Sequence, residues 1–353
     1  MKILVTGGAG FIGSAFIRLL SRETNHEFVN LDKLTYAAMP EALSDVERSP
    51  RYRFEMADVA DQAAVTRILA THAPDAVIHL AAETHVDRSI DSASPFIQAN
   101  ILGTFGLLEA ARGYWRALAP GRRQEFRFLQ VSTDEVYGSL PETGRFDEST
   151  PYRPNSPYAA SKAAADHLSR AWRQTYGLPV LGANCSNNYG PYQFPEKLIP
   201  LTIIKALRRE PIAVYGDGSN IRDWIYVDDH ARALLAILEH GRIGASYGIG
   251  ADGEQRNIAV VRKICAILDT LCPLPDQKTH DSLIRLVPDR PGHDYRYAID
   301  SGMLRREIGW RPRESFDSGL EKTVRWYLAQ RDWWQAILAD RYSGERLGVD
   351  AGR

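Results

Sequence analysis

Two side chains that can move a proton stand four residues apart in Ser156-Pro-Tyr-Ala-Ala-Ser-Lys162. Ser156 is typical of a helix N-cap and Pro157 of the first helical position, so Tyr158 and Lys162 are expected on one face of a helix. A phenol has a pKa near 10, too high for a general base at neutral pH; a neighbouring ammonium or a nicotinamide cation would each stabilise its phenolate. Because the pair is common on solvated helices, it indicates chemistry only beside a redox cofactor.

Three further reactive side chains, Thr133, Asp134 and Glu135, follow the apolar run 126–131. The Thr133 hydroxyl can hydrogen-bond the same substrate oxygen that Tyr158 deprotonates. Hydride transfer alone needs neither carboxyl, whereas an elimination needs a base for a carbon-bound proton beside a ketone and an acid for the departing oxygen. In a partly dry cleft the pKa values of paired carboxyls can be pushed apart. The alternative is an Asp-Glu loop that caps the next turn.

The redox cofactor is expected at the N-terminus, where the apolar run 3–5 leads through glycines into a helical pattern over 11–20. Gly7, Gly10 and Gly13 have the spacing of a dinucleotide-binding turn, which lets the backbone approach a pyrophosphate at a helix N-terminus. A second apolar run, 27–31, ends at Asp32, where a carboxylate would accept hydrogen bonds from the adenosine ribose. This arrangement favours NAD over NADP and over an ordinary glycine-rich turn.

The elements that would position these residues alternate between strand and helix. Strands are expected at 3–5, 27–31, 52–57, 76–82 and 126–131, and helices at about 11–20, 61–69, 95–115 and from 157 onward. Such alternation predicts an α/β fold with a doubly wound parallel Rossmann sheet, whose ligand site lies beyond the carboxyl ends of the strands.

The composition changes at residue 187, after which Pro and Gly become frequent. This change predicts a second, smaller α/β domain that binds the substrate. We expect an NAD-binding domain formed by 1–185 plus about 224–250, and a substrate domain formed by about 186–223 and 251–345. A cleft between them would hold a small molecule. The tail after Trp334 is polar and glycine-bearing, which suggests surface structure.

Composition excludes several classes of protein. The 353 residues are 44% hydrophobic and 25% charged, with a formal charge of −1, so neither a nucleic acid nor a membrane surface is an expected partner. No apolar run is long enough to span a bilayer. Cys185, Cys265 and Cys272 lack metal-ligand spacing, so reduced thiols and no metal are expected. Residues 1–13 do not resemble a signal peptide, which makes the cytoplasm the simplest compartment.

Polar residues in the Pro- and Gly-rich loops of the second half are candidates to bind a sugar and a phosphate. Asn187 offers an amide for hydroxyl groups, and Lys197, Arg222 and Arg290 offer cations, of which arginine pairs with phosphate oxygens in a fork-like geometry. Most of the 43 Lys and Arg residues must be solvated surface, so only the position of these three in such loops favours them.

By these motifs the sequence resembles the extended short-chain dehydrogenase/reductases, and within them the branch that dehydrates nucleotide-linked hexoses. The resemblance runs from Met1 to about Trp326. It rests on Thr6-Gly-Gly-Ala-Gly-Phe-Ile-Gly-Ser14, Leu31-Asp-Lys-Leu-Thr-Tyr-Ala37, Ala81-Ala-Glu-Thr-His-Val-Asp-Arg-Ser89, Ser132-Thr-Asp-Glu-Val-Tyr-Gly138, Tyr158 with Lys162, Asn184-Cys-Ser-Asn-Asn-Tyr-Gly-Pro191 and Asp289-Arg-Pro-Gly-His-Asp294. The Thr-Asp-Glu triplet and the Asn-Asn-Tyr-Gly-Pro stretch are specific to the dehydratase branch.

The resemblance implies a reaction on dTDP-linked glucose. Tightly bound NAD takes a hydride from C4 while Tyr158 takes the 4-hydroxyl proton, Glu135 removes H5, Asp134 protonates the leaving C6 hydroxyl, and the hydride returns to C6. It also implies a homodimer that pairs through the helices at about 95–115 and 157–175 in a four-helix bundle.

The resemblance further implies two sets of binding residues. Cofactor contacts are expected at Gly7, Gly10, Phe11, Ile12, Gly13, Asp32, Lys33, Leu34, Thr35, Asp58, Val59, Leu80, Ala81, Ala82, Thr84, Tyr158, Lys162 and Asn188. Substrate contacts are expected at Thr84, Thr133, Asn187, Lys197, Leu198, Ala213, Tyr215, Arg222, Asn257, Arg290 and His293, with 213–215 near the nucleobase.

Four positions depart from the pattern of the branch. Ala38-Met-Pro replaces a Gly-Asn-Leu-like continuation, Thr84 replaces Ser and Ala99 replaces Thr, and these leave the chemistry intact. Tyr295 replaces an Arg, removing a possible cation near the diphosphate, so the choice between a dTDP and a UDP substrate stays open.

Two alternatives remain. A sugar-nucleotide epimerase, decarboxylase or UDP-sugar dehydratase would use the same scaffold, and the first two do not require Asp134 as a proton donor. A regulatory protein that only holds NAD could dispense with the Tyr/Lys pair or with the carboxyls.

Overall fold

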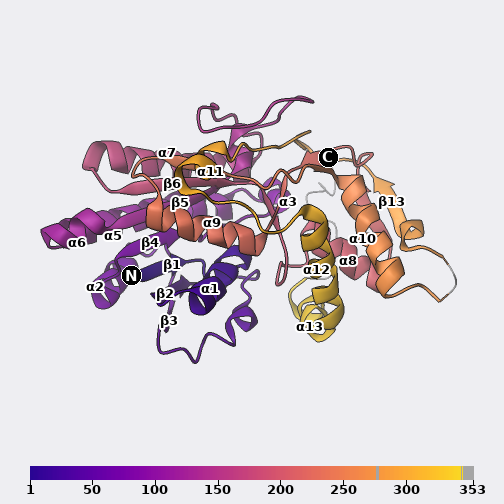
Figure 1. Ribbon diagram of the computed structural model, residues 1–353, viewed down its shortest axis with the longest axis horizontal. Coiled ribbons are helices and arrows are strands. Elements are labelled where there is room, and N and C mark those ends of the chain that lie inside the picture. Colours follow the sequence, from indigo (N-terminus) through magenta and orange to yellow (C-terminus); the bar gives the residue numbers. More distant parts are fainter. Residues whose placement is uncertain (276–277, 343, 345–353) are drawn as a thin grey trace.

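A seven-stranded parallel sheet lies at the centre of the computed structural model, which describes residues 1–275, 278–342 and 344 (Figure 1). Its strands follow the order β11-β6-β5-β4-β1-β2-β3. They are β1 (Lys2–Thr6), β2 (Glu27–Asp32), β3 (Tyr52–Met56), β4 (Ala76–His79), β5 (Arg127–Thr133), β6 (Val180–Cys185) and β11 (Ser246–Ile249). This order reverses between β1 and β4, which confirms the doubly wound Rossmann sheet and creates a crevice at the carboxyl ends of these two strands.

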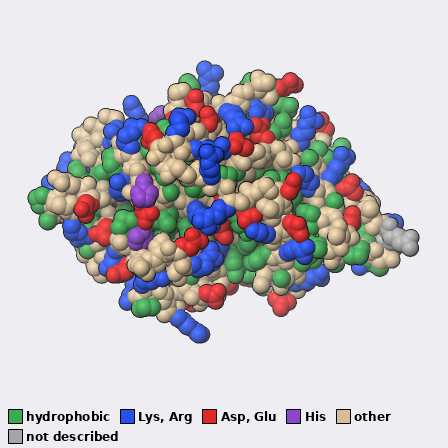
Figure 2. All heavy atoms as spheres, in the orientation of Figure 1, with side chains coloured by type: hydrophobic (Ala, Val, Ile, Leu, Met, Phe, Trp, Pro, Cys, Tyr) green, Lys and Arg blue, Asp and Glu red, His purple; other side chains and the backbone are tan. Residues whose placement is uncertain are grey.

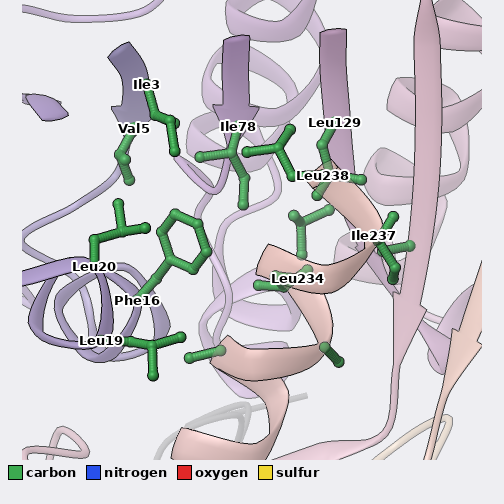
Figure 3. Packing of buried hydrophobic residues seen from close by; sticks show 14 of the residues in the cluster. Ile3, Val5, Phe16, Leu19, Leu20, Ile78, Leu129, Leu234, Ile237 and Leu238 are labelled. Atoms are coloured by element: carbon green, nitrogen blue, oxygen red, sulfur yellow. The ribbon is translucent and has the colours of Figure 1, made fainter. Parts of the chain in front are cut away.

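Helices cover both faces of the sheet because each face carries apolar side chains. One face is covered by α1 (Phe11–Glu23), α9 (Val227–His240) and α11 (Gly302–Ile308), and the other by α2 (Gln62–His72), α5 (Gly103–Ala117) and α7 (Pro157–Tyr176). Figure 3 shows the first layer, in which Phe16 of α1 and Leu234 of α9 point toward Val5, Ile78 and Leu129 of the strands. Burying one such side chain contributes about 1.5–3 kcal/mol.

The helix starts follow from local capping residues. Asp61 accepts a hydrogen bond from the Ala64 amide at 3.0 Å and begins α2. Ser156 accepts one from the Ala159 amide at 3.1 Å, and Pro157 occupies the first position of α7. The predicted positions of these two helices are confirmed, because a cap is a local property of the sequence.

The long helix expected at 95–115 is continuous but irregular. It consists of α4 (Ser94–Phe96), the π-helical η2 (Ile97–Leu102) and α5. A side chain on Gly106 would place its Cβ 3.2 Å from the carbonyl oxygen of Val59, so α5 packs closely on the loop that follows β3. Ala99 of the π-helical segment lines the cavity at the carboxyl edge of the sheet, and such segments often lie at functional sites.

A second core lies beyond the carboxyl edge of the sheet (Figure 1). It packs around Tyr189, Ile203, Val260 and Leu320. Its elements are β7 (Asn187–Tyr189), β8 (Ile212–Tyr215), β9 (Ile221–Arg222), β10 (Trp224–Tyr226), β12 (Gln255–Arg256), β13 (Ile284–Val287), α8 (Leu198–Leu207), α10 (Asn257–Leu271), α12 (Phe316–Ala329) and α13 (Arg331–Asp340). The remaining short elements are η1 (Pro40–Leu43), α3 (Val86–Asp91), α6 (Pro120–Glu125), η3 (Asp134–Tyr137) and η4 (His280–Leu283).

Two expectations about secondary structure and surface need correction. β4 ends at His79 rather than at residue 82, because the chain turns there into the crevice. The tail after Trp334 is not all surface: Ile337 and Tyr342 are buried against Met39 and Phe194. The predicted surface tail and the predicted substrate domain also included some of the residues 343 and 345–353. These lie outside the described residues.

On the face of the molecule shown in Figure 2, Lys and Arg side chains are interspersed with Asp and Glu. Among the described residues, no helix is both long and apolar enough to cross a membrane. All three cysteines are free thiols, of which Cys185 and Cys265 are buried.

Candidate active site

A cavity of about 280 Å³ opens at the carboxyl ends of β1, β2 and β4, where the sheet reverses its strand order. The predicted cofactor contacts line it, with Leu34 as the one exception among them. They are Gly7, Gly10, Phe11, Ile12, Gly13, Asp32, Lys33, Thr35, Asp58, Val59, Leu80, Ala81, Ala82, Thr84, Tyr158, Lys162 and Asn188.

The tight packing of the turn after β1 depends on its glycines. Gly7 has a φ of +71°, and a Cβ there would lie 2.6 Å from the Ala81 amide nitrogen. A Cβ on Gly13 would lie 2.1 Å from the Gly7 carbonyl oxygen, so α1 could not begin as close to β1. The residues present therefore fit a dinucleotide whose pyrophosphate lies against the start of α1.

Asp32 ends β2 with its carboxylate fixed by backbone amides. Oδ2 accepts a hydrogen bond from the Ala9 amide at 2.9 Å, and Oδ1 accepts one from the Leu34 amide at 2.8 Å. The side chain lines the cavity, so its free lone pairs face the position that a ribose would occupy. A carboxylate there favours two hydroxyls and repels a 2′-phosphate.

Tyr158 and Lys162 lie on the first two turns of α7, and both are buried in the wall of the same cavity. The Lys162 Nζ donates to the Val131 carbonyl at 2.7 Å, which fixes the ammonium beneath β5. Burial, followed by the negative charge of Glu135, raises the pKa of the Tyr158 phenol well above its usual value, and the Thr133 hydroxyl lowers it. Without a bound cofactor, the burial of Tyr158 thus raises its pKa by more than neighbouring groups lower it. The lowering expected from the spacing of Tyr158 and Lys162 does not prevail.

The two neighbouring carboxyls occupy different environments. Asp134 is 1% exposed, and its Oδ1 accepts a hydrogen bond from the Thr133 hydroxyl at 3.3 Å, while its Oδ2 is buried without a partner. Burial, and then the charges of Glu135 and Asp223, raise the pKa of Asp134 well above its usual value. The environment of Asp134 therefore favours its protonated form, and Oδ2 remains an unused polar atom.

The pKa of Glu135 is also raised, but unlike Asp134 this carboxyl has three cations around it. It is partly accessible and lines the cavity. Burial raises its pKa, but the charges of Arg290, Arg222 and Lys197 lower it in turn. Of the two carboxyls, Glu135 is the one that the surrounding charge favours as a carboxylate.

A second cavity of about 340 Å³ adjoins the first, and Glu135, Asn187, Lys197 and Thr84 line both. With one exception, the predicted substrate contacts line this second cavity. They are Thr84, Asn187, Lys197, Leu198, Ala213, Tyr215, Arg222, Asn257, Arg290 and His293; Thr133 lines the first cavity instead. The cleft thus joins the predicted cofactor site to a cation-rich site across Glu135.

Three residues highlighted by the sequence lie elsewhere. Leu34 is partly exposed and does not line the cavity, although its amide fixes Asp32. Asp134 lies behind Thr133 rather than on the surface of either cavity. Tyr295 also lines neither cavity, and its carbonyl oxygen accepts a hydrogen bond from Arg222. The departure expected at position 295 thus lies outside the walls of both cavities.

Sequence reasoning missed two further carboxyls: Asp87 lines the substrate cavity, and Asp166 lines a separate hollow. Asp87 is buried, forms an ion pair with Arg290 and accepts a hydrogen bond from the Tyr215 hydroxyl at 3.0 Å. Asp166 accepts hydrogen bonds from the Ser132 hydroxyl at 2.6 Å and from the Tyr152 hydroxyl at 3.0 Å. The partners of Asp87 are 203 and 128 residues away and those of Asp166 are 34 and 14 residues away, so none of these pairs follows from helix or strand spacing.

Within the described ranges, no group of three or more His, Cys, Asp or Glu side chains is arranged to hold a metal ion.

Similarity to known proteins extends over nearly the whole chain. The family model described as GDP-mannose 4,6 dehydratase matches residues 4–323. A dTDP-glucose 4,6-dehydratase of Neisseria meningitidis serogroup B is 56% identical over 351 residues, which cover 99% of each chain. A dTDP-glucose 4,6-dehydratase of Streptomyces venezuelae, solved with NAD and dTDP bound, is 45% identical with a TM-score of 0.87, covering 96% of this chain and 100% of that one. UDP-glucose 4-epimerase of Thermus thermophilus, solved with NAD, is 30% identical with a TM-score of 0.81, covering 94% and 100%.

Proposed function

This chain belongs to the family of the dTDP-glucose 4,6-dehydratases, and we propose how the residues of its cleft carry out that reaction. It is an NAD-dependent hydro-lyase that converts dTDP-glucose to dTDP-4-keto-6-deoxyglucose and water. When bound, NAD⁺ supplies the acceptor for the C4 hydride and later returns that hydride to C6.

The residues of the cleft move the protons. Tyr158 takes the proton of the 4-hydroxyl group, with the Thr133 hydroxyl hydrogen-bonded to the same oxygen. Because the resulting 4-ketone acidifies the neighbouring carbon, Glu135 removes the C5 proton, and Asp134 donates its proton to the departing C6 oxygen. Glu135 then returns a proton to C5. Lys162 contributes a positive charge beside the phenol.

One observation supports this division of labour more than any other. Adjacent carboxyls of the same loop have unequal environments: Asp134 is buried with an unpartnered oxygen, and Glu135 faces the cleft among three cations. An elimination requires one proton-bearing acid and one ionised base at once. An epimerase or a protein that merely holds NAD has no need for the pair.

The substrate base is tested by incubation with dTDP-, UDP- and GDP-glucose. We expect the 4-keto-6-deoxy product from dTDP-glucose at the highest kcat/KM, because the chain matches dTDP-glucose 4,6-dehydratases over nearly its whole length. Ala213 and Tyr215, the residues expected near the nucleobase, line the substrate cavity. The product is measured through the absorbance of the 4-ketone in strong base. Recovery of dTDP-galactose instead would indicate epimerisation. A higher kcat/KM for UDP-glucose would show that the enzyme prefers uracil as the nucleobase of its substrate.

The homodimer is also a proposal, supported by exposed apolar side chains on one helical surface. Ile97, Leu102 and Phe105 are each more than 40% exposed, and Phe105 packs edge-on against Trp172 of α7. A surface of this kind marks a protein contact. We expect a Leu102→Glu variant to sediment as a monomer and the wild type as a dimer; a wild type that sediments as a monomer would refute the proposal.

The domain division and the compartment are proposals of the same kind. Separate cores around Phe16 and around Tyr189 support a cofactor unit of 1–185 with 224–250 and a substrate unit of 186–223 with 251–345. Limited proteolysis that never cleaves near these boundaries would count against it. Three free thiols fit the reducing cytoplasm, which cell fractionation tests.

A further inference from the structure

A buried carboxylate, Glu196, lies where the cofactor and substrate cavities meet, and the proposed reaction gives it no task. It lines both cavities, and its side chain is 2% exposed. The Tyr36 hydroxyl donates to Oε1 at 3.1 Å, and the Arg88 Nε donates to Oε2 at 2.8 Å. Each oxygen of this carboxylate is thus bound by a donor from a different segment of the chain.

The two donors also contact each other. The Arg88 guanidinium lies over the Tyr36 ring, 4.2 Å from its centroid, which is the geometry of a cation–π interaction. The Tyr36 ring in turn packs edge-on against Phe194 at 5.4 Å. We call the mutually bound set of Tyr36, Arg88 and Glu196 the clasp.

The clasp joins three segments that each form a wall of the cleft. Tyr36 belongs to the loop 33–37, which follows Asp32 and lines the cofactor cavity. Arg88 lies on α3, which follows the cofactor-lining turn after β4. Glu196 precedes Lys197, whose Nζ donates to the Thr84 carbonyl at 3.0 Å. Separating the loop 33–37 from the substrate side of the cleft therefore breaks the Tyr36–Glu196 hydrogen bond and the Tyr36–Arg88 cation–π contact, both of which the Arg88–Glu196 ion pair holds in position.

The reaction places an unusual demand on cofactor binding. The hydride taken from C4 returns to C6 of the same sugar, so a cofactor that leaves between the two steps strands a half-reacted substrate. This argument rests on the proposed function. An ion pair with one partner this deeply buried resists opening, because separation would leave a desolvated charge without its partner.

We propose that Glu196 is a positioning residue whose clasp with Tyr36 and Arg88 keeps the dinucleotide in its cavity throughout the turnover. Glu196 acts through the loop 33–37 and α3, and not on the reacting atoms. Its effect is on the rate at which the cofactor dissociates.

The test measures retained cofactor in the holoenzyme. Wild type and Glu196→Gln are loaded with NAD⁺ and desalted, and the NAD that remains bound is released by acid and quantified over time. We expect Glu196→Gln to lose NAD at least tenfold faster. Arg88→Met should behave alike, and the double variant should be no faster than either single variant, because both changes break one ion pair.

A milder variant and a matched control complete the design. Tyr36→Phe removes one hydrogen bond and keeps the ring, so a smaller increase in NAD loss is expected; it also serves as the test should Glu196→Gln fail to fold. Glu321→Gln breaks an exposed Glu–Arg pair on α12 and should retain NAD as the wild type does.

The proposal would be overturned if Glu196→Gln and Tyr36→Phe both retained NAD as long as the wild type does. Additive effects of Glu196→Gln and Arg88→Met on the rate of NAD loss would overturn it as well. The assay uses no sugar, so a wild type that fails to dehydrate dTDP-glucose would refute the proposed function and leave the retention result standing. In turnover, added NAD⁺ should restore the declining rate of Glu196→Gln and leave the wild type unchanged.

Discussion

Replacing Asp134 by Asn is expected to slow the elimination by about 10²- to 10⁴-fold while the first oxidation continues, because the amide cannot protonate the departing C6 oxygen. The unpartnered Oδ2 and the raised pKa of Asp134 identify it as the protonated member of the carboxyl pair. After rapid mixing with dTDP-glucose, the absorbance of reduced cofactor should accumulate and persist. Equal loss of oxidation and elimination would contradict the acid role, and Asp61→Asn, at a helix cap that lines neither cavity, is the control.

The pH dependence of the same step has a definite sign. Because the pKa of Asp134 is raised and its protonated form is the active one, the elimination rate should fall as pH rises through that pKa. Oxidation should instead fall as pH decreases, since Tyr158 acts only as the phenolate. Measuring the oxidation and the elimination separately in single turnovers distinguishes these two pH dependences. A pH-independent elimination, or one that accelerates with rising pH, would argue against Asp134 as the donor.

Replacing Tyr158 by Phe is expected to abolish the first step, with at least a 10²-fold loss in the rate at which reduced cofactor appears. The ring would still fill its buried position against Phe96, so folding and NAD binding should persist. The rate is followed by absorbance, and bound NAD is quantified in the same sample. The control is Tyr114→Phe in α5, which removes a hydroxyl bound to the Pro74 carbonyl at a position that lines neither cavity. If Tyr158→Phe oxidised the substrate at the wild-type rate, another group would be the base.

Local patterns in the sequence were sufficient for the elements that carry the cofactor site. A strand, a glycine turn and a helix within the first 23 residues lie close along the chain, so their spacing predicts their contact. The Ser156-Pro157 cap likewise fixes Tyr158 and Lys162 on one face of α7. Strand ends of a parallel sheet share one edge, and for that reason Gly7, Asp32 and Thr133 meet in a single cavity.

Burial and long-range pairing were decided only by the tertiary structure. The sequence placed Asp134 beside Glu135, but their unequal pKa shifts arise from Asp223, Arg222, Arg290 and desolvation, which no local spacing encodes. Likewise Glu196 meets Tyr36 across 160 residues and Arg88 across 108. The polar composition of the tail after Trp334 likewise did not predict that Ile337 is buried. A backbone period predicts which residues share a face, whereas the free energy of a charge depends on what surrounds it, and folding brings those neighbours from remote parts of the chain.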